Sequence, residues 1–157
     1  MKLHILAVGD RAPSWARDAC ADYQKRFPPH CPLHIQAVPT PRRGKNPDIS
    51  KLKDKEFQSL FACIPKGALV IALDERGKSR TTDQLAKRLD GWKQTEKDVA
   101  FLIGGPDGLA PAALEESNET WSLSPLTLPH ALVRVIIIEQ LYRALSILED
   151  HPYHRGN

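Results

Sequence analysis

Four short runs of aliphatic residues, with helical patterns between them, most constrain how this chain can fold. The runs are LHILAV (3–8), LHIQAV (33–38), ALVIAL (68–73) and VAFLI (99–103). Each is short and almost continuously apolar, which is typical of a strand covered on both faces. Strands that alternate with helices predict an α/β fold, with a mostly parallel sheet and helices on both of its faces.

Periodic apolar residues and capping signals indicate where the helices lie. Two stripes at helical spacing are Trp15, Ala19, Tyr23 and Phe27, and then Leu85, Leu89 and Trp92. Asn46 and Pro47 suit a cap and first-turn position for a helix over residues 49–60, and Thr82 suits a cap for a helix over residues 83–92. A further helix is expected to start near Pro111.

The most apolar stretch, residues 131–148, approaches the length of a membrane span. It carries Arg134, Glu139 and Arg143. Because burial of these charges in lipid is costly, we expect a helix buried by protein. Its apolar residues occupy more than one face, which suggests subunit packing in a homodimer.

Length, cysteine use and charge exclude several classes of protein. The 157 residues match one ordinary domain. The three cysteines show no CxxC pair, so neither a disulfide framework nor a zinc site is encoded. The opening apolar run meets Asp10 and Arg11 too early for a signal peptide, and a cytoplasmic protein is expected. A net charge of +3 permits an anionic partner without naming it.

The segment LIGGPDGL, residues 102–109, is a candidate ligand loop because it directly follows a strand. The turn after the first strand has one glycine, Gly9, which excludes a dinucleotide fingerprint, and no phosphate P-loop pattern is present. No G-x-S-x-G motif or recognisable catalytic cysteine indicates a covalent nucleophile. The structural alternative for Gly104 and Gly105 is a tight turn before the next helix.

Two further segments are candidates for binding. TWSLSPLTLPH (120–130) is too rich in proline for a central strand, and its leucines Leu123, Leu126 and Leu128 could line a pocket with exposed backbone groups. PTPRRGKNP (39–47) predicts a flexible, positively charged arm.

Several motifs together resemble the ribosomal RNA large subunit methyltransferase H family, which belongs to the SPOUT class. They are RRGKN, LIGGPDG, WSLSPLTLPHALVR, EQLYRALSI and HPYHR, and the match covers essentially the full chain. The resemblance implies a single SPOUT methyltransferase domain over residues 1–157 with a carboxyl-terminal trefoil knot. Ordinary rules of chain connection argue against a knot, so this expectation comes from the resemblance alone.

The resemblance also implies an activity. The family transfers a methyl group from S-adenosylmethionine, without a metal, to N3 of pseudouridine 1915 in 23S rRNA of the assembled 70S ribosome. It is homodimeric, with each active site completed by the neighbouring subunit. The alternative is a non-catalytic ribosome-binding or RNA-binding module of the same fold.

Positions that match the family's cofactor site are expected to bind S-adenosylmethionine. They are Leu73, Gly104, Gly105, Leu123, Ser124, Pro125, Leu126, Thr127 and Leu128. Glycines allow close backbone approach to the ligand, and leucines supply apolar walls. Core packing is the structural alternative for the leucines.

Four positions match the family's catalytic motifs. The resemblance implies that Arg143 holds a phosphate or the developing negative charge, that Tyr153 is a platform for the target base, and that His154 accepts the proton. His130 is the fourth candidate. The structural alternatives are a first-turn role for His130, an ion pair between Arg143 and Glu139, and a frayed solvated tail over residues 151–157.

The resemblance also gives the basic arm a role. Arg42, Arg43 and Lys45 are expected to contact backbone phosphates of the RNA. The structural alternative is a solvated loop.

Overall fold

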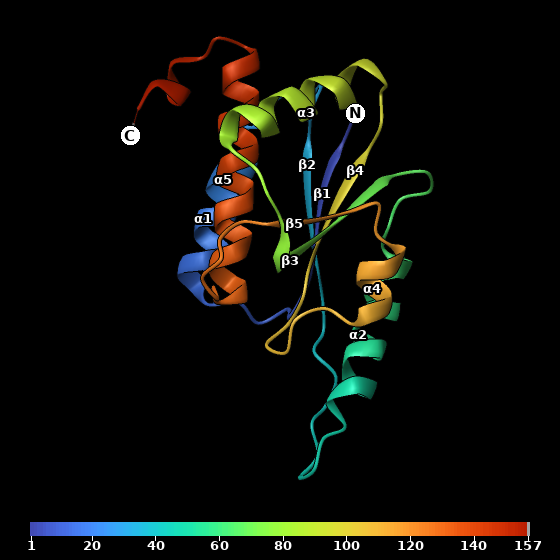
Figure 1. The fold of residues 1–157 in the computed structure, drawn as a ribbon. Helices are drawn as coiled ribbons and strands as arrows, with labels where there is room; N and C mark the ends of the chain where they lie inside the picture. The colour runs from blue at the N-terminus through green and yellow to red at the C-terminus, as the bar shows by residue number, and fades with distance from the viewer. Residues whose placement is uncertain (157) are drawn as a thin grey trace.

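The computed structural model describes residues 1–156, which form one parallel sheet with helices on both faces (Figure 1). The strands pair in the order β2-β1-β4-β3-β5, and every pair is parallel. The strands are β1 (Leu3–Val8), β2 (Leu33–Val38), β3 (Leu69–Ser79), β4 (Val99–Ile103) and β5 (Glu119–Ser122). The helices are α1 (Ser14–Gln24), α2 (Ile49–Ala62), α3 (Thr82–Gln94), α4 (Pro111–Glu116), α5 (His130–Leu148) and a short 3₁₀ helix (Pro152–Arg155). The predicted α/β architecture is confirmed.

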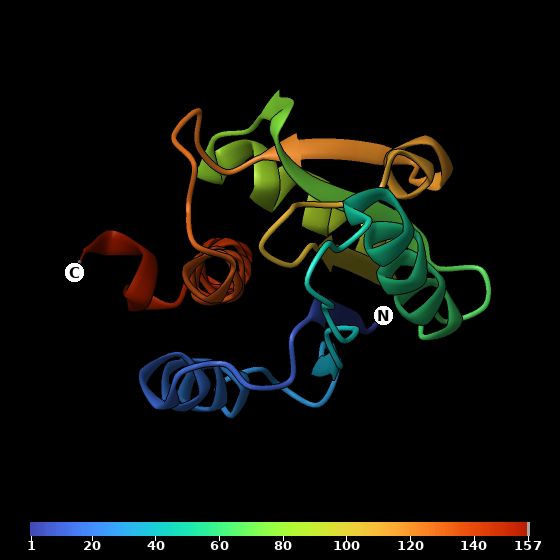
Figure 2. The ribbon, with the colours of Figure 1, turned by 90° about the horizontal axis from the view of Figure 1, so that it is seen from below.

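The helices form two layers. Helices α1, α3 and α5 cover one face of the sheet, whereas α2 and α4 cover the other (Figures 1 and 2). Successive strand residues point to opposite faces of the sheet. Phe101 packs against the face covered by α1, α3 and α5, and Leu102 packs against the face covered by α2 and α4. Full burial of each such side chain stabilises the fold by roughly 1.5–3 kcal/mol. Because helices cover both faces of the sheet at β4, every residue of this strand is buried.

The prediction that every strand is covered on both faces is wrong for β2. This strand lies at the edge of the sheet, and its residues His34, Gln36 and Ala37 are exposed. The apolar run LHIQAV therefore contains a polar face that solvent covers, as parallel edge strands allow.

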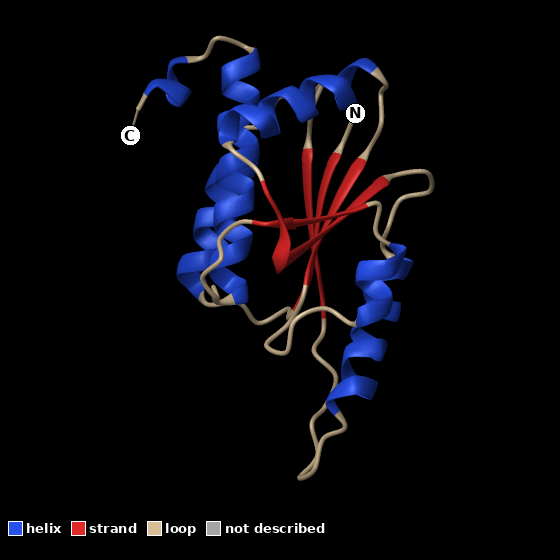
Figure 3. Ribbon diagram, viewed as in Figure 1, coloured by secondary structure: helices blue, strands red, loops and turns tan. Residues whose placement is uncertain are grey.

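The third strand is longer than predicted, and a fifth strand follows it in the sheet. β3 continues past Leu73 to Ser79, with a register shift between Leu73 and Lys78 where it pairs with β5 (Figure 3). A Cβ atom at Gly77 would lie 2.7 Å from backbone atoms of Thr120 and Trp121, so glycine permits this close pairing. The proline-rich segment does form a strand, but only at the sheet edge and only as far as Ser122, before Pro125.

The predicted stripe on α1 is wrong in phase. The buried residues of this helix are Ala16 and Cys20, whereas Trp15 is 54% exposed. Phe27 lies beyond the end of the helix, although it is buried. The stripe of Leu85, Leu89 and Trp92 on α3 is confirmed.

The predicted helix caps are displaced by one or two residues. The N-cap of α2 is Asp48, whose side chain accepts a hydrogen bond from the backbone N–H of Lys51. The N-cap of α3 is Thr81, which forms a capping box with Gln84. In both helices the residue that caps is the one whose side chain accepts a hydrogen bond from the backbone N–H three residues further on, at Lys51 and Gln84.

Helix α5 packs between α1 and α3 against the sheet (Figure 2). Its residues Ile137, Ile138 and Leu141 are fully buried. Within residues 1–156, no helix is both long enough and apolar enough to cross a membrane.

Candidate functional site

A cavity of about 650 Å³ opens at the carboxyl end of β4 and beside the middle of β3, next to the start of α5. Ligand cavities for small molecules have this order of volume. Expected cofactor residues that line it are Leu73, Gly104, Gly105, Leu123, Ser124, Leu126, Thr127 and Leu128. Pro125 does not line it. The structure therefore brings the three predicted segments together at one cavity.

The floor of the cavity is a turn that requires glycine. The backbone N–H of Gly108 donates to the carbonyl oxygen of Gly105 at 3.0 Å, and Gly108 has a φ of +79°. A Cβ atom at Gly104 would lie 2.5 Å from the carbonyl carbon of Gly108, which no side chain tolerates. A Cβ atom at Gly105 would lie 3.1 Å from Cγ1 of Val8. The glycines therefore do form a tight turn, and that turn lines the cavity.

One wall of the cavity is the loop between β5 and α5. The Ser124 hydroxyl accepts a hydrogen bond from the backbone N–H of Leu126, while the Ser122 hydroxyl donates to the carbonyl of Ser124. The Thr127 hydroxyl donates to Oε2 of Glu75 at 2.7 Å and so joins this loop to β3. These bonds set the shape of the wall, whose Leu126 side chain is 71% exposed.

Charged residues at the cavity were missed by the sequence analysis. Asp74, Glu75 and Arg76 follow the last β3 residue in register with β4, and Asp107 lies in the turn after β4. The hydrogen bond from the Arg76 side chain is the main cause that lowers the pKa of Asp74. The polar residues DER directly after a buried strand were the available signal, since parallel strands end at one edge of the sheet.

His130 begins α5 and lines the same cavity. Burial is the main cause that lowers the pKa of its imidazole, and the positive charge of Arg134 lowers that pKa further. Arg134 is itself buried, and its Nη2 donates to the carbonyl oxygens of Val8 and Gly9 at 2.7 and 2.6 Å. His130 therefore lies close to a fixed positive charge.

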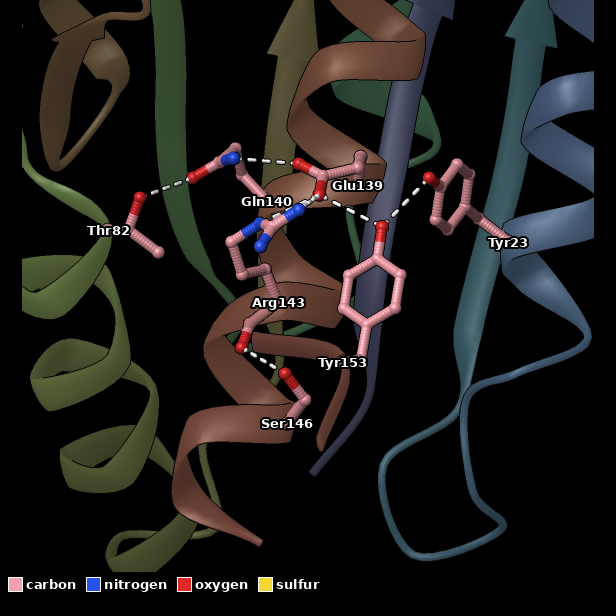
Figure 4. A network of polar contacts seen from close by, with 7 residues as sticks. All are labelled: Tyr23, Thr82, Glu139, Gln140, Arg143, Ser146 and Tyr153. Atoms are coloured by element: carbon pink, nitrogen blue, oxygen red, sulfur yellow. Dashed lines mark hydrogen bonds and ion pairs between the residues drawn. The ribbon is translucent and has the colours of Figure 1, made fainter. Parts of the chain in front are cut away.

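Two other catalytic candidates, Arg143 and Tyr153, form a cluster with Glu139 and Tyr23 on the later part of α5 (Figure 4). The Tyr153 hydroxyl lies 2.8 Å from that of Tyr23 and donates to Oε1 of Glu139 at 3.0 Å. Arg143 forms an ion pair with the same carboxylate at 2.7 Å. Burial is the main cause that raises the pKa of Tyr153, and its hydrogen bonds add to this. The proposed structural alternative for Arg143, a pair with Glu139, is thus present in the structure.

Residues 152–155 form a 3₁₀ helix whose Tyr153 packs on α5, so the alternative of a frayed tail is wrong for these residues. His151 and Gly156 on either side are exposed. The ring centroids of Tyr153 and Tyr142 lie 4.8 Å apart, and Arg143 lies over the Tyr153 ring. Nδ1 of His154 contacts the carbonyl oxygen of His151. Asn157 lies outside the described residues.

The four catalytic candidates are not together in one chain. His130 and Arg143 lie on one helix, and 13 residues of α-helix span about 20 Å. His130 is at the cavity, whereas Arg143, Tyr153 and His154 lie towards the opposite end of α5 (Figure 1).

The basic arm projects beyond the carboxyl ends of the strands, between β2 and α2 (Figure 1). Arg42, Arg43 and Lys45 are exposed. Arg43 also forms an ion pair with Asp107 of the cavity turn. Arg43 thereby joins the arm to the turn that lines the cavity, whereas Arg42 and Lys45 lie in an exposed loop.

The described residues contain no cluster of three or more His, Cys, Asp or Glu side chains suited to a metal ion.

Solved structures share this fold. A probable methylase family protein from Haemophilus influenzae Rd KW20 aligns with a TM-score of 0.59 at 13% identity, covering 96% of this chain and 69% of its own. A probable methyltransferase from Bordetella pertussis Tohama I aligns with a TM-score of 0.57 at 16% identity, covering 91% and 95%. At these identities the likeness establishes the fold class alone.

Sequence comparison gives the family. The family model described as "Predicted SPOUT methyltransferase" matches residues 1–154, and the chain belongs to the SPOUT methyltransferase family. The chain is also 48% identical over 155 residues to "Ribosomal RNA large subunit methyltransferase H" of Thioalkalivibrio sulfidiphilus, covering 99% of both proteins. The resemblance found in the sequence is confirmed. The trefoil knot and the single domain over residues 1–157 stay predictions.

Proposed function

We propose that this protein is an S-adenosylmethionine-dependent methyltransferase that methylates N3 of pseudouridine 1915 in 23S rRNA of the assembled ribosome. The observation that carries the proposal is the cavity that joins LIGGPDG with the segment 123–130. Both segments carry the family motifs, and the relative that matches 99% of the chain has a name specifying ribosomal RNA.

The chemistry of the cavity fits the methyl donor. S-adenosylmethionine supplies a methyl group on a positively charged sulfonium. Gly104 permits the close turn against Gly108 that lines the cavity, while leucines such as Leu123 and Leu128 offer apolar surface to the adenosyl group. Glu75 and Asp107 place negative charge at the cavity, which complements a cationic ligand.

The transfer requires a group that removes the N3 proton of the base. His130 at the cavity and His154 at the carboxyl terminus are the two candidates. In the proposal Arg143 stabilises negative charge or holds a phosphate, and Tyr153 supports the target base. Because one chain keeps these groups about 20 Å from His130, they act on the cavity of a second subunit.

A homodimer is therefore part of the proposal. The outer side of α5 carries apolar residues that one chain leaves only half-buried, including Leu132, Val135 and Ile136. Trp15 on the neighbouring α1 is exposed. A second copy packed against this surface would cover these side chains and bring its carboxyl-terminal cluster to the cavity.

The basic arm supports RNA as the partner. Arg42, Arg43 and Lys45 would contact phosphates of 23S rRNA in the 70S ribosome, and Arg43 would link that contact to the cavity turn through Asp107. We expect the protein to act in the cytoplasm, where ribosomes are found.

The test is transfer of labelled methyl from S-adenosylmethionine to unmodified ribosomes and to free large-subunit rRNA, followed by nucleoside mass analysis. We expect 3-methylpseudouridine with assembled ribosomes and its loss in Gly105→Trp and His154→Ala. Gly91→Ala is the control, because a Cβ atom at this helix position meets no atom within 4 Å. Salt-sensitive ribosome binding without any transfer would instead support a non-catalytic binding module.

A further inference from the structure

Arg134 is a buried cation whose function the site described above does not explain. It is 5% exposed, and its Nε atom is buried without a hydrogen-bond partner in the described chain. No carboxylate shifts the pKa of Arg134: burial lowers it, and the only other group that affects it is the Cys20 thiol of α1. A buried charge without an opposite charge costs stability, and here two backbone carbonyl oxygens are the acceptors that offset this cost.

The side chains of Arg134 and His130 meet at the end of β1. They are four residues apart on α5 and therefore lie on one face of the helix. A Cβ atom built on Gly9 would lie 3.2 Å from Nη2 of Arg134 and 3.9 Å from Nε2 of His130. The two bonds from Arg134 to the carbonyl oxygens of Val8 and Gly9 fix the first turns of α5 against this strand end.

We propose that Arg134 is a positioning residue for methyl transfer: it fixes the start of α5 and keeps the neighbouring His130 uncharged at the cavity, where His130 accepts the N3 proton of the target base. The inference rests on the proposed function and assigns its proton acceptor. It selects His130 over His154 as the proton acceptor, because His130 lines the cavity and lies beside the Arg134 charge. The loss of transfer expected for His154→Ala is then a loss of support for the target base.

The proton and the electrons balance in this step. The lone pair of N3 forms the new bond to the methyl carbon, and the electron pair of the carbon–sulfur bond returns to sulfur. The N3–H bond leaves its electron pair on nitrogen, and the proton passes to the imidazole of His130 and then to water. An already protonated imidazole cannot accept it and would also repel the positive sulfonium.

The charged surroundings of His130 favour this role for Arg134. Asp74, Glu75 and Arg76 of β3 and Asp107 after β4 line the same cavity. Cys20 of α1 faces Arg134, and burial raises the pKa of its thiol, which keeps it neutral. Among these groups only the Arg134 charge shifts the pKa of His130, in the same direction as burial.

The test compares wild-type protein with Arg134→Met and Arg134→Lys. The His130 ring is titrated by NMR, and single-turnover methyl transfer to ribosomes is measured against pH. Since His130 must be neutral, the rate rises with pH through its pKa. Loss of the positive charge in Arg134→Met should move both the titration and the acidic limb to higher pH, reducing the rate at pH 6 relative to pH 8 about threefold or more. Arg134→Lys keeps the charge and should leave both in place.

Two controls make the outcomes decisive. His130→Gln should remove the acidic limb, and methyl-donor binding with a thermal melt establishes that each variant is folded. If Arg134→Met does not fold, Arg134→Gln takes its place. The role of Arg134 is overturned if folded, active Arg134→Met or Arg134→Gln shows the same rise of rate with pH as wild type. It is also overturned if that rise persists in His130→Gln. Absence of transfer by the wild-type protein overturns the proposed function itself.

Discussion

At Gly104 a single added carbon decides whether the turn after β4 can form. Gly104→Ala would place Cβ 2.5 Å from the carbonyl carbon of Gly108, so the turn must move and the cavity floor moves with it. We expect affinity for S-adenosylmethionine, measured by calorimetry, to fall at least tenfold, which corresponds to about 1.4 kcal/mol. Gly91→Ala should leave affinity unchanged and stabilise the protein by roughly 0.5–1 kcal/mol, as expected within a helix. Equal affinities of the two variants would refute this view of the turn.

Glu56 makes stability depend on pH. Its carboxyl group is buried on α2 behind Gly105, and burial, followed by the negative charge of Asp107, raises its pKa above the usual 4.5. The contribution of protonated Glu56 to the free energy of unfolding is therefore complete below pH 4.5, and it is lost as the pH rises through the folded-state pKa of Glu56. Glu56→Gln should melt higher than wild type at pH 7, with little difference at pH 4. The exposed Glu115→Gln is the control, and a pH-independent difference for Glu56→Gln would contradict the assignment.

At the scale of elements, the hydrogen bond between Thr127 and Glu75 joins the cavity wall to β3. Thr127→Val keeps the shape of the side chain and removes the donor, which frees the loop from the strand. We expect the affinity for S-adenosylmethionine to fall roughly fivefold, as loss of about 1 kcal/mol implies. Thr95→Val removes a comparable hydroxyl at the end of α3 and should change nothing. A Thr127→Val protein that binds like wild type would show that this bond does not shape the cavity.

The strands β1, β2 and β4 could be predicted from the sequence with their observed bounds, whereas the edge strand β5 could not. Both faces of β1 and β4 lie under helices, so their residues are apolar almost throughout. β5 pairs with an irregular extension of β3, and that pairing depends on Gly77 rather than on an apolar pattern. The phase of α1 was wrong because Trp15 is exposed in one chain although it is strongly apolar.

At the scale of the whole molecule, the site followed from the sequence only through the family resemblance. The order and spacing of residues predicted a ligand loop at residues 102–109 and pocket-lining leucines near residue 126, but they did not identify the ligand. It also missed Asp74 and Glu75, since charged residues after a strand are common in solvated loops. No local pattern indicates that His130 and Arg143 lie about 20 Å apart along α5.

Because His130 and Arg143 lie about 20 Å apart along α5, the proposed active site needs residues of two subunits. If the cavity of one subunit uses Arg143 and Tyr153 of the other, a heterodimer can recover activity from two inactive chains. Gly105→Trp displaces the turn that lines the cavity, because its side chain would meet Val8 and Glu56. Arg143→Ala removes a group of the carboxyl-terminal cluster. In their heterodimer one of the two composite sites has both parts intact.

The most direct measurement is therefore methyl transfer to ribosomes by this heterodimer, made by co-expression with two different tags and purified through both. Each variant purified alone should transfer no methyl group above background. We predict that the heterodimer recovers roughly half of the wild-type rate per dimer, because one of its two sites is intact. A heterodimer as inactive as its parents, or a protein that stays monomeric at working concentration, would contradict the composite site.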